Sequence, residues 1–495
     1  MKKKLWRRLY LAADLLLMLA VAALVPLNLF VYPFPEWVML LAIVLLVIVN
    51  GGFVEKFDPR KLYKVLLIIA AVPVISFSLI GSYCNPYWNS LLLRESGPTE
   101  PYDELMTYEQ AKEDMDYMMR YFQKCHPIFL ERSQGNLQVK YQDALERLGN
   151  AHEITVNDVR TEMQRIFYTL NDAHTTAWGK WEDERYLRTF DARKSAGWEL
   201  ASVNGTLLET MLKEKKTLFS YEVESWGMKE LKNNLFTLSG LDYLGIDPNG
   251  VKYTWQNNSG MTETETYTVE DFLLYDDYME HNRAFRSDDT EEESFVSYTI
   301  DERKSLALLT LKACDYSQEY IDCLKKMFTE VKDKNIRNVA VDLRGNGGGS
   351  SMVANEFIRY LNVSQFRTDK SKWRLGFFNI PFNDNVTVNH KYDGLTFEGS
   401  VFVLTDTSSF SSAMLFAEYI KDNDLGTLIG EPPGNIPNGY GDVAVFQLPN
   451  SGLYFQVSTK KFSRIDGDTT EKLVMPDIQC TSAKALNVLY QNLER

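Results

Sequence analysis

Val339-Ala-Val-Asp-Leu-Arg-Gly-Asn-Gly-Gly-Gly-Ser350 is the stretch that decides the fold, because an apolar run of β-type residues ends there in a glycine-rich turn. Thr405-Asp-Thr-Ser-Ser-Phe-Ser-Ser-Ala-Met414 repeats the arrangement with serines in the turn. A segment with a helical pattern follows each turn. The first turn offers bare backbone N–H groups and the second offers hydroxyls. An enzyme that attacks a carbonyl carbon needs both a nucleophile and donors for the oxyanion.

The sequence around these turns predicts a mixed α/β core. Apolar runs typical of strands alternate with helical patterns from residue 305 onward. Two helical stretches precede this core, and the region between about 175 and 300 has turn signals and short strand-like runs. We therefore expect four soluble segments after the N-terminal region. They are a linker (86–105), a helical subdomain (106–180), a β-rich insertion (181–300) and the catalytic core (301–495).

The first 85 residues differ in composition from the rest of the chain. They contain three apolar stretches, each near the roughly 20 residues that cross a bilayer as a helix. We expect transmembrane helices at about 9–31, 37–53 and 62–83. A cleaved signal peptide is the alternative for the first stretch, but two further stretches follow and no small-x-small cleavage site is evident.

Basic residues predict the orientation of these helices, because Lys and Arg gather on the cytoplasmic side. Five of them precede the first stretch, and four lie between the second and third: Lys2, Lys3, Lys4, Arg7, Arg8, Lys56, Arg60, Lys61 and Lys64. This pattern predicts a multi-pass protein of the cell membrane with a cytoplasmic N-terminus. Everything after the third stretch is then extracytoplasmic.

The net charge argues against nucleic acid as a partner. The whole chain carries −14, although residues 1–64 hold nine basic and only four acidic residues. The soluble part is therefore strongly acidic, which disfavours binding to a polyanion. Five cysteines are too few for a disulfide framework, and whether Cys314 and Cys323 pair is left open.

Taken alone, the candidate chemical residues have structural explanations. Serines before a helix most often cap it. The glycine cluster lacks the Gly-Lys-Ser/Thr of a P-loop, and Ser350 replaces the last glycine of a dinucleotide fingerprint. Five histidines are present without zinc spacing, so no metal or cofactor is expected. His174 follows a helix in a turn of small residues, where an isolated histidine is more often structural than catalytic.

A family resemblance changes this balance. The chain from about 108 to 480 resembles the C-terminal processing and tricorn-core peptidases of family S41. Leu170-Asn-Asp-Ala-His-Thr175 is similar to the family's "DxHT" segment, and Val341–Gly349 to its "DLRxNxGG" signature. The segments Ser409–Pro432 and Val457–Ile478 resemble its nucleophile helix and closing "PD" segment. The resemblance implies a ClpP/crotonase-like core and serine peptidase activity.

The resemblance also implies roles for single residues. It aligns the nucleophile with Ser411. The oxyanion donors become Ser412, Gly347 and Gly348. The lysine of the Ser/Lys members is replaced by Ile436, so the base implied is the histidine of the other branch, His174.

The remaining role is the acid that orients this histidine. The position before Pro476-Asp477 implies Glu471, with Asp466 or Asp468 as alternatives. Trp198–Gly205 resembles the start of the family's PDZ-like insertion, although no clear carboxylate-binding loop accompanies it.

These observations predict a membrane-anchored serine endopeptidase that cleaves peptides or proteins on the extracytoplasmic side. Two other classes remain open: a non-catalytic module that binds peptide or lipid on the same fold, and an esterase that uses the same Ser/His chemistry. Neither the substrate nor the oligomeric state follows from the sequence.

Overall fold

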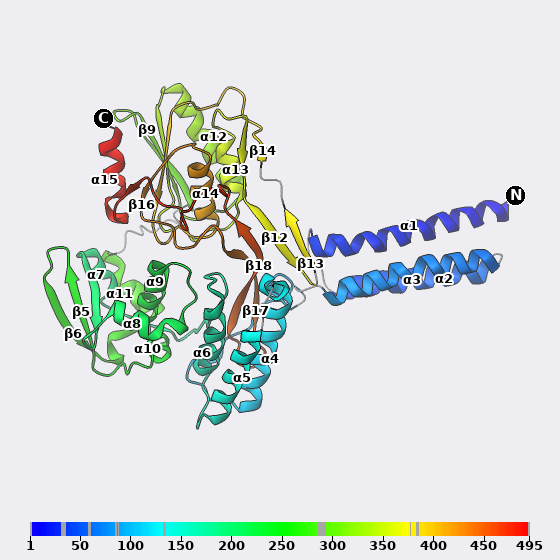
Figure 1. Ribbon diagram of the computed structural model, residues 1–495, viewed down its shortest axis with the longest axis horizontal. Coiled ribbons are helices and arrows are strands. Elements are labelled where there is room, and N and C mark those ends of the chain that lie inside the picture. Colours follow the sequence, from blue (N-terminus) through cyan, green and yellow to red (C-terminus); the bar gives the residue numbers. More distant parts are fainter. Residues whose placement is uncertain are drawn as a thin grey trace.

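Three helices form an extension on one side of the molecule in the computed structural model (Figure 1). The structure describes residues 2–30, 36–57, 61–84, 87, 89–131, 135–285, 294–376, 378–382 and 386–493. The three helices pack on one another and are α1 (Lys2–Phe30), α2 (Glu36–Phe57) and α3 (Lys61–Cys84).

One of these helices is long and apolar enough to cross a bilayer. That stretch is Arg8–Val25 in α1, whereas the apolar stretches Trp37–Gly52 and Ile68–Ser78 are shorter. The structure thus supports one candidate span within its described residues, and three spans stay a prediction. Most of the basic side chains that predict the orientation lie outside the described part: Lys2, Lys3, Lys4, Arg7, Lys56, Arg60, Lys61 and Lys64.

The helical subdomain packs against strands from the far end of the chain. Two of its three helices begin with a capping box, which satisfies backbone N–H groups that a helix start leaves free. The helices are α4 (Tyr108–Cys125), α5 (Gly135–Asn150) and α6 (Val156–Phe167). Their apolar faces share one core with Ala444, Phe446, Phe455 and Val457.

Those C-terminal residues belong to an antiparallel sheet of order β1-β18-β12-β13, with β17 also paired to β18. Its strands are β1 (Thr176–Trp178), β12 (Lys370–Leu375), β13 (Phe378–Phe382), β17 (Tyr440–Gln447) and β18 (Tyr454–Ser463). The segment expected as a linker is docked on this sheet, because the N–H of Leu91 donates to the carbonyl of Val445 at 2.8 Å.

The insertion contains helices as well as the expected strands. Its sheet has the strand order β4-β3-β5-β6. Buried residues alternate with more exposed ones along β5. The strands are β3 (Trp198–Val203), β4 (Thr206–Leu207), β5 (Val251–Asn257) and β6 (Thr262–Tyr267), with a separate pair β2 (Arg185–Leu187) and β7 (Phe272–Leu274). The helices are α7 (Phe190–Ser195), α8 (Leu208–Lys215), α9 (Glu224–Leu235), α10 (Leu238–Tyr243) and α11 (Tyr275–Asn282).

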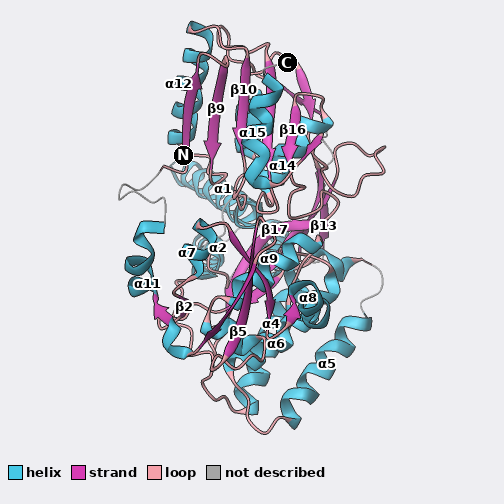
Figure 2. Cartoon of the chain, turned by 90° about the vertical axis from the view of Figure 1, so that its left-hand side faces the viewer, coloured by secondary structure: helices cyan, strands magenta, loops and turns pink. Residues whose placement is uncertain are grey.

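The core is a six-stranded sheet of order β19-β16-β15-β10-β9-β8 that stands in the upper half of Figure 2. Only the edge strand β8 runs antiparallel. The strands are β8 (Val296–Asp301), β9 (Leu306–Leu311), β10 (Asn338–Asp342), β15 (Ser400–Thr405), β16 (Thr427–Gly430) and β19 (Ile478–Gln479). A small pair, β11 (Gln365–Arg367) and β14 (Val386–Val388), lies beside it.

Helices cover both faces of this sheet, which explains why its central strands are almost entirely apolar. Three helices share the larger core on one face, and the C-terminal helix forms the smaller core on the other. They are α12 (Gln318–Asp333), α13 (Met352–Ile358), α14 (Ser412–Asp422) and α15 (Ser482–Leu493). The expected mixed α/β core is therefore present.

The end of α14 is held by a buried ion pair that should carry a large share of local stability. Arg464 donates two hydrogen bonds to Asp422, at 2.8 and 2.9 Å, and both side chains are at most 3% exposed. Asp422→Ala leaves the guanidinium buried without its partner, so we expect the free energy of unfolding to fall by about 3–5 kcal/mol.

Urea unfolding of the purified protein, followed by near-UV circular dichroism, measures this loss. Lys140→Ala is the matched control, because it breaks an exposed pair with Asp143 (3.7 Å) and should cost less than about 1 kcal/mol. Equal losses in the two variants would contradict the assignment.

Candidate active site

The serine turn holds Ser411 in a strained conformation between β15 and α14. Its φ is 54° and its ψ is −120°, a combination that non-glycine residues adopt at a cost of about 1–3 kcal/mol. The N–H of Ser411 donates to Oδ1 of Asn435 at 2.8 Å, which holds the turn from the other side. Ser411 lines a cavity of about 290 Å³. A serine on such an elbow presents its hydroxyl at the end of the sheet.

The glycine turn packs directly on this elbow. A Cβ on Gly348 would lie 2.7 Å from Cβ of Ser411, and one on Gly349 would lie 2.3 Å from the carbonyl oxygen of Cys314. Both glycines also have positive φ, 102° and 138°. A side chain at either position would therefore strain the backbone and displace its neighbour.

The oxyanion donors expected from the sequence are only partly available. The N–H of Gly348 already donates to Oδ1 of Asn346 at 2.9 Å. Within the described residues, the N–H groups of Gly347, Gly349 and Ser412 donate to no protein acceptor. Of these three, Gly349 and Ser412 line the cavity, and the Ser412 hydroxyl joins them by donating to the Gly349 carbonyl at 2.7 Å. The free donors nearest the nucleophile are thus Ser412 and Gly349.

Asp172 organises the turn that carries His174. Its carboxylate is fully buried and accepts hydrogen bonds from the backbone N–H of His174 (2.9 Å) and the Thr175 hydroxyl (2.6 Å). It also lies 3.1 Å from Nε2 of His126. Burial alone would raise the pKa of Asp172, but the hydrogen bond and charge of His126 and the charge of His174 outweigh it and lower this pKa to about 2.

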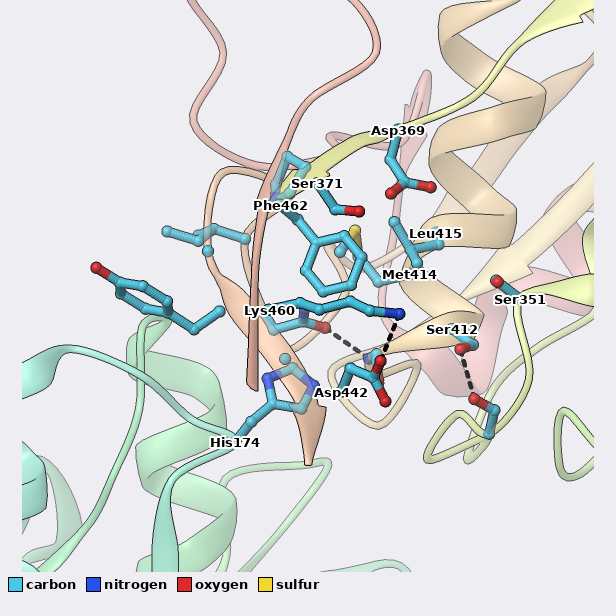
Figure 3. Close-up of a pocket in the computed structure, with 18 of the residues that line it drawn as sticks. His174, Ser351, Asp369, Ser371, Ser412, Met414, Leu415, Asp442, Lys460 and Phe462 are labelled. Carbon is cyan, nitrogen blue, oxygen red and sulfur yellow. Dashed lines mark hydrogen bonds and ion pairs between the residues drawn. The ribbon is translucent and has the colours of Figure 1, made fainter. Parts of the chain in front are cut away.

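The ring of His174 lies in the wall of the same cavity as Ser411 (Figure 3). Its centroid is 4.5 Å from that of Phe410, the residue before the nucleophile. Neither ring nitrogen has a hydrogen-bond partner among the described residues. Burial lowers the pKa of His174, and the charges of Asp172 and Asp442 oppose that shift only in part. The imidazole is therefore neutral at neutral pH, as a general base must be.

The structure does not bring Glu471 to this histidine. The Glu471 carboxylate lies 3.6 Å from Nη2 of Arg464 and 3.7 Å from Nζ of Lys421, and it does not line the cavity. The cause is the buried Arg464, which also donates to the backbone carbonyls of Glu471 and Leu473 and so holds this segment at the end of α14. The alternatives Asp466 and Asp468 do not line the cavity either.

Sequence reasoning missed two contributors to the site, Asn435 and Glu222. Asn435 holds the nucleophile turn, and Lys460 enters the cavity paired with Asp442 at 2.5 Å. Glu222 comes from the insertion and accepts a hydrogen bond from the N–H of Ile436 at 2.8 Å. No sequence pattern marks Glu222, which lies in the stretch between α8 and α9 of the insertion.

Glu222, Asp172 and His174 are also the residues that could hold a metal ion in the described part of the chain. Each offers a ligand atom, and these atoms lie within 4.8 Å of one another. However, Asp172 already accepts hydrogen bonds on both of its oxygens. The group therefore fits a histidine held between two carboxyl groups better than a metal site.

Comparisons with known proteins agree with this geometry. The model of "Peptidase family S41" matches residues 306–480. The tail-specific protease of Haemophilus influenzae is 24% identical over 196 residues, which cover 38% of this chain and 26% of that protein. The chain thus matches about a quarter of the length of this curated relative.

Solved structures show the fold. The structure of mature CPAF is 15% identical in sequence and superposes with a TM-score of 0.55. The match covers 78% of this chain and 96% of the CPAF chain. Mature CPAF complexed with lactacystin is 14% identical, covers 78% of this chain and 97% of its own, and has a TM-score of 0.54. The match of residues 306–480 to the model of peptidase family S41 confirms the resemblance noted in the sequence for this part of the chain.

Proposed function

We propose that this protein is a serine peptidase in which Ser411 is the nucleophile and His174 is the general base. The observation that carries the proposal is that both residues line one cavity, although they lie in different parts of the chain. Ser411 attacks the carbonyl carbon of a peptide bond while its hydroxyl proton moves to His174. The protonated imidazole then gives that proton to the leaving amine, and water hydrolyses the acyl-enzyme in the same way.

The oxyanion of the tetrahedral intermediate is stabilised by backbone N–H groups. Ser412 and Gly349 are the donors that we assign, because both line the cavity and neither N–H has another acceptor among the described residues. Gly347 is a further candidate, whereas Gly348 would first have to release Asn346. Each such donor typically contributes 10²–10³-fold to the rate.

The substrate that we propose is a peptide or protein. Polar residues at the mouth of the cavity, including Ser351 and Ser371, offer hydrogen bonds to an extended chain. The name of the bacterial relative, a tail-specific protease, is consistent with cleavage near a C-terminus.

We also propose that the protein is anchored in the cell membrane by three N-terminal spans and acts on the extracytoplasmic side. The support is the candidate span Arg8–Val25, the two further apolar helices packed on it and the basic residues between them. The acidic character of the soluble part agrees with a position away from the anionic cytoplasmic leaflet.

The topology is tested by protease treatment of intact cells. Residues beyond 100 should be accessible without lysis, because the basic loops keep the N-terminus inside. Protection of the soluble part until the cells are lysed would refute this orientation.

The nucleophile is tested with a fluorophosphonate probe, which reacts with activated serines. Ser411→Ala should abolish both labelling and peptide hydrolysis, since the neighbouring Ser412 hydroxyl is engaged by the Gly349 carbonyl. Ser408→Ala is the control from the same turn and should keep most of the activity, because Ser408 does not line the cavity. Hydrolysis by Ser411→Ala at the wild-type rate would reject the assignment.

The base is tested by the pH dependence of labelling. Because burial lowers the pKa of His174, activity should persist below pH 6.5, the ordinary midpoint of histidine, and fall only as the pH drops through that lowered value. His174→Ala should lose roughly 10²–10⁴-fold, the usual contribution of proton transfer.

The alternative base is Lys460, which also lines the cavity but is paired with Asp442. Full activity in His174→Ala together with its loss in Lys460→Ala would indicate a Ser/Lys mechanism instead.

A further inference from the structure

The proposed base lacks an orienting partner in the usual place. Neither ring nitrogen of His174 has a hydrogen-bond partner among the described residues, although the residue is only 6% exposed. Nδ1 lies 3.8 Å from Oδ1 of Asp172, which is too far for a hydrogen bond, and that oxygen already accepts the backbone N–H of His174. An imidazole that acts as a base needs one nitrogen held as a donor so that the other is free to accept.

Glu222 has a carboxyl oxygen that is free to accept such a hydrogen bond. Its Oε2 accepts the N–H of Ile436 at 2.8 Å, which fixes the carboxyl group, whereas its Oε1 is buried and has no partner in the described structure. A carboxyl oxygen of Glu222 lies within 4.8 Å of a ring nitrogen of His174 and of the Asp172 carboxylate. A Cβ on Gly439 would lie 3.1 Å from Oε1, so the glycine leaves room for this group.

We propose that Glu222, supplied by the insertion, is the positioning residue of His174, with Oε1 accepting a hydrogen bond from Nδ1–H. Nε2 then keeps its lone pair for the Ser411 hydroxyl. Nε2 lies beside Gly441, which lines the cavity, and a Cβ there would be 3.6 Å from it. This assignment rests on the proposed peptidase function and names the acid that the resemblance had assigned to Glu471.

Electrostatics favour this pairing during the reaction. Burial and then the negative charge of Asp172 raise the pKa of Glu222 to about 8. When His174 takes the proton of Ser411, a positive charge appears within 4.8 Å of the Glu222 carboxyl group. That charge favours the ionised carboxylate, so the attraction grows as the proton moves. An interaction that strengthens toward the transition state is one that accelerates the reaction.

Packing also links the segment that contains Glu222 to the turn that carries Ser411. The Trp226 ring, four residues after Glu222, stacks on Phe410 with a centroid distance of 4.1 Å, and Phe410 contacts the His174 ring. The Nζ atom of Lys229 lies over the Trp226 ring, 4.2 Å from its centroid. The start of α9 therefore packs against the turn that carries Ser411, and the same contact places Glu222 beside His174.

The test is the second-order rate at which a fluorophosphonate probe labels Ser411 in the detergent-solubilised full chain between pH 5 and 9. Glu222→Gln keeps the size of the side chain and one acceptor oxygen but cannot ionise, and Glu222→Ala loses both the acceptor and the ionisable group. We expect Glu222→Ala to lose a large part of the roughly 10²–10⁴-fold contribution of proton transfer, and Glu222→Gln to lose less.

The pH profile separates positioning from a merely structural role. The titratable groups that face His174 are Asp172 from its own turn, Asp442 from β17 and Glu222 from the insertion. Glu222 can ionise when His174 takes up a proton, whereas Gln cannot, so protonation of His174 becomes less favourable in Glu222→Gln and the acid limb of labelling should move to lower pH. Glu224→Gln, an exposed change at the first residue of α9, is the matched control and should label like the wild type with an unchanged limb.

Two results would overturn the proposal. One is wild-type rate and an unmoved acid limb in both Glu222 variants, and the other is a loss confined to Glu471→Gln. If Glu222→Ala does not fold, the isosteric Glu222→Gln decides. Failure of the peptidase function itself would appear separately, as peptide hydrolysis that survives Ser411→Ala.

Discussion

The site depends on the parallel pairing of β10 with β15. In that register Asp342 lies opposite Leu404, so the two strands end side by side and their turns meet at one edge of the sheet. Contact between the turns is so close that Gly348 has no room for a Cβ against Ser411, and the hydroxyl of Ser412 bonds to the Gly349 carbonyl. The proposed nucleophile and oxyanion donors are thus brought together by sheet pairing, before any other part of the chain contributes.

This part of the site could be predicted from the sequence because it is local. The stretches Val339–Ser350 and Thr405–Met414 each run from a strand through a turn toward a helix within about a dozen residues, and such patterns carry their own geometry. The strained φ of Ser411 and the positive φ values of the glycines are consequences of the same turns. Which N–H groups are free was harder to predict, because it depends on whether the Asn346 side chain accepts a hydrogen bond from the N–H of Gly348.

The orienting acid could not be predicted because it depends on tertiary contacts. Glu471 has the expected position along the chain, but the buried Arg464 attracts its carboxylate and holds its backbone at the end of α14. The position of a residue in the sequence sets its distance along the chain from a motif. Electrostatic pairing determines the direction of its side chain. Glu222 lies 48 positions after His174 in a separate folding unit, and only the docking of α9 brings the two together.

The outcome is an active site divided among three parts of the chain. By our proposal, the core supplies the nucleophile Ser411, the helical subdomain supplies the base His174 and the insertion supplies Glu222. The central sheet and the insertion each have an apolar core of their own, whereas the helical subdomain shares its core with strands β17 and β18. The insertion contacts the other units through the stack of Trp226 on Phe410, the bond from Ile436 to Glu222 and the hydrogen bonds of Ser220 with Gln164 and the Thr175 carbonyl. Because these contacts hold the insertion beside His174, any ligand that shifts the insertion would change the orientation of His174 without touching Ser411.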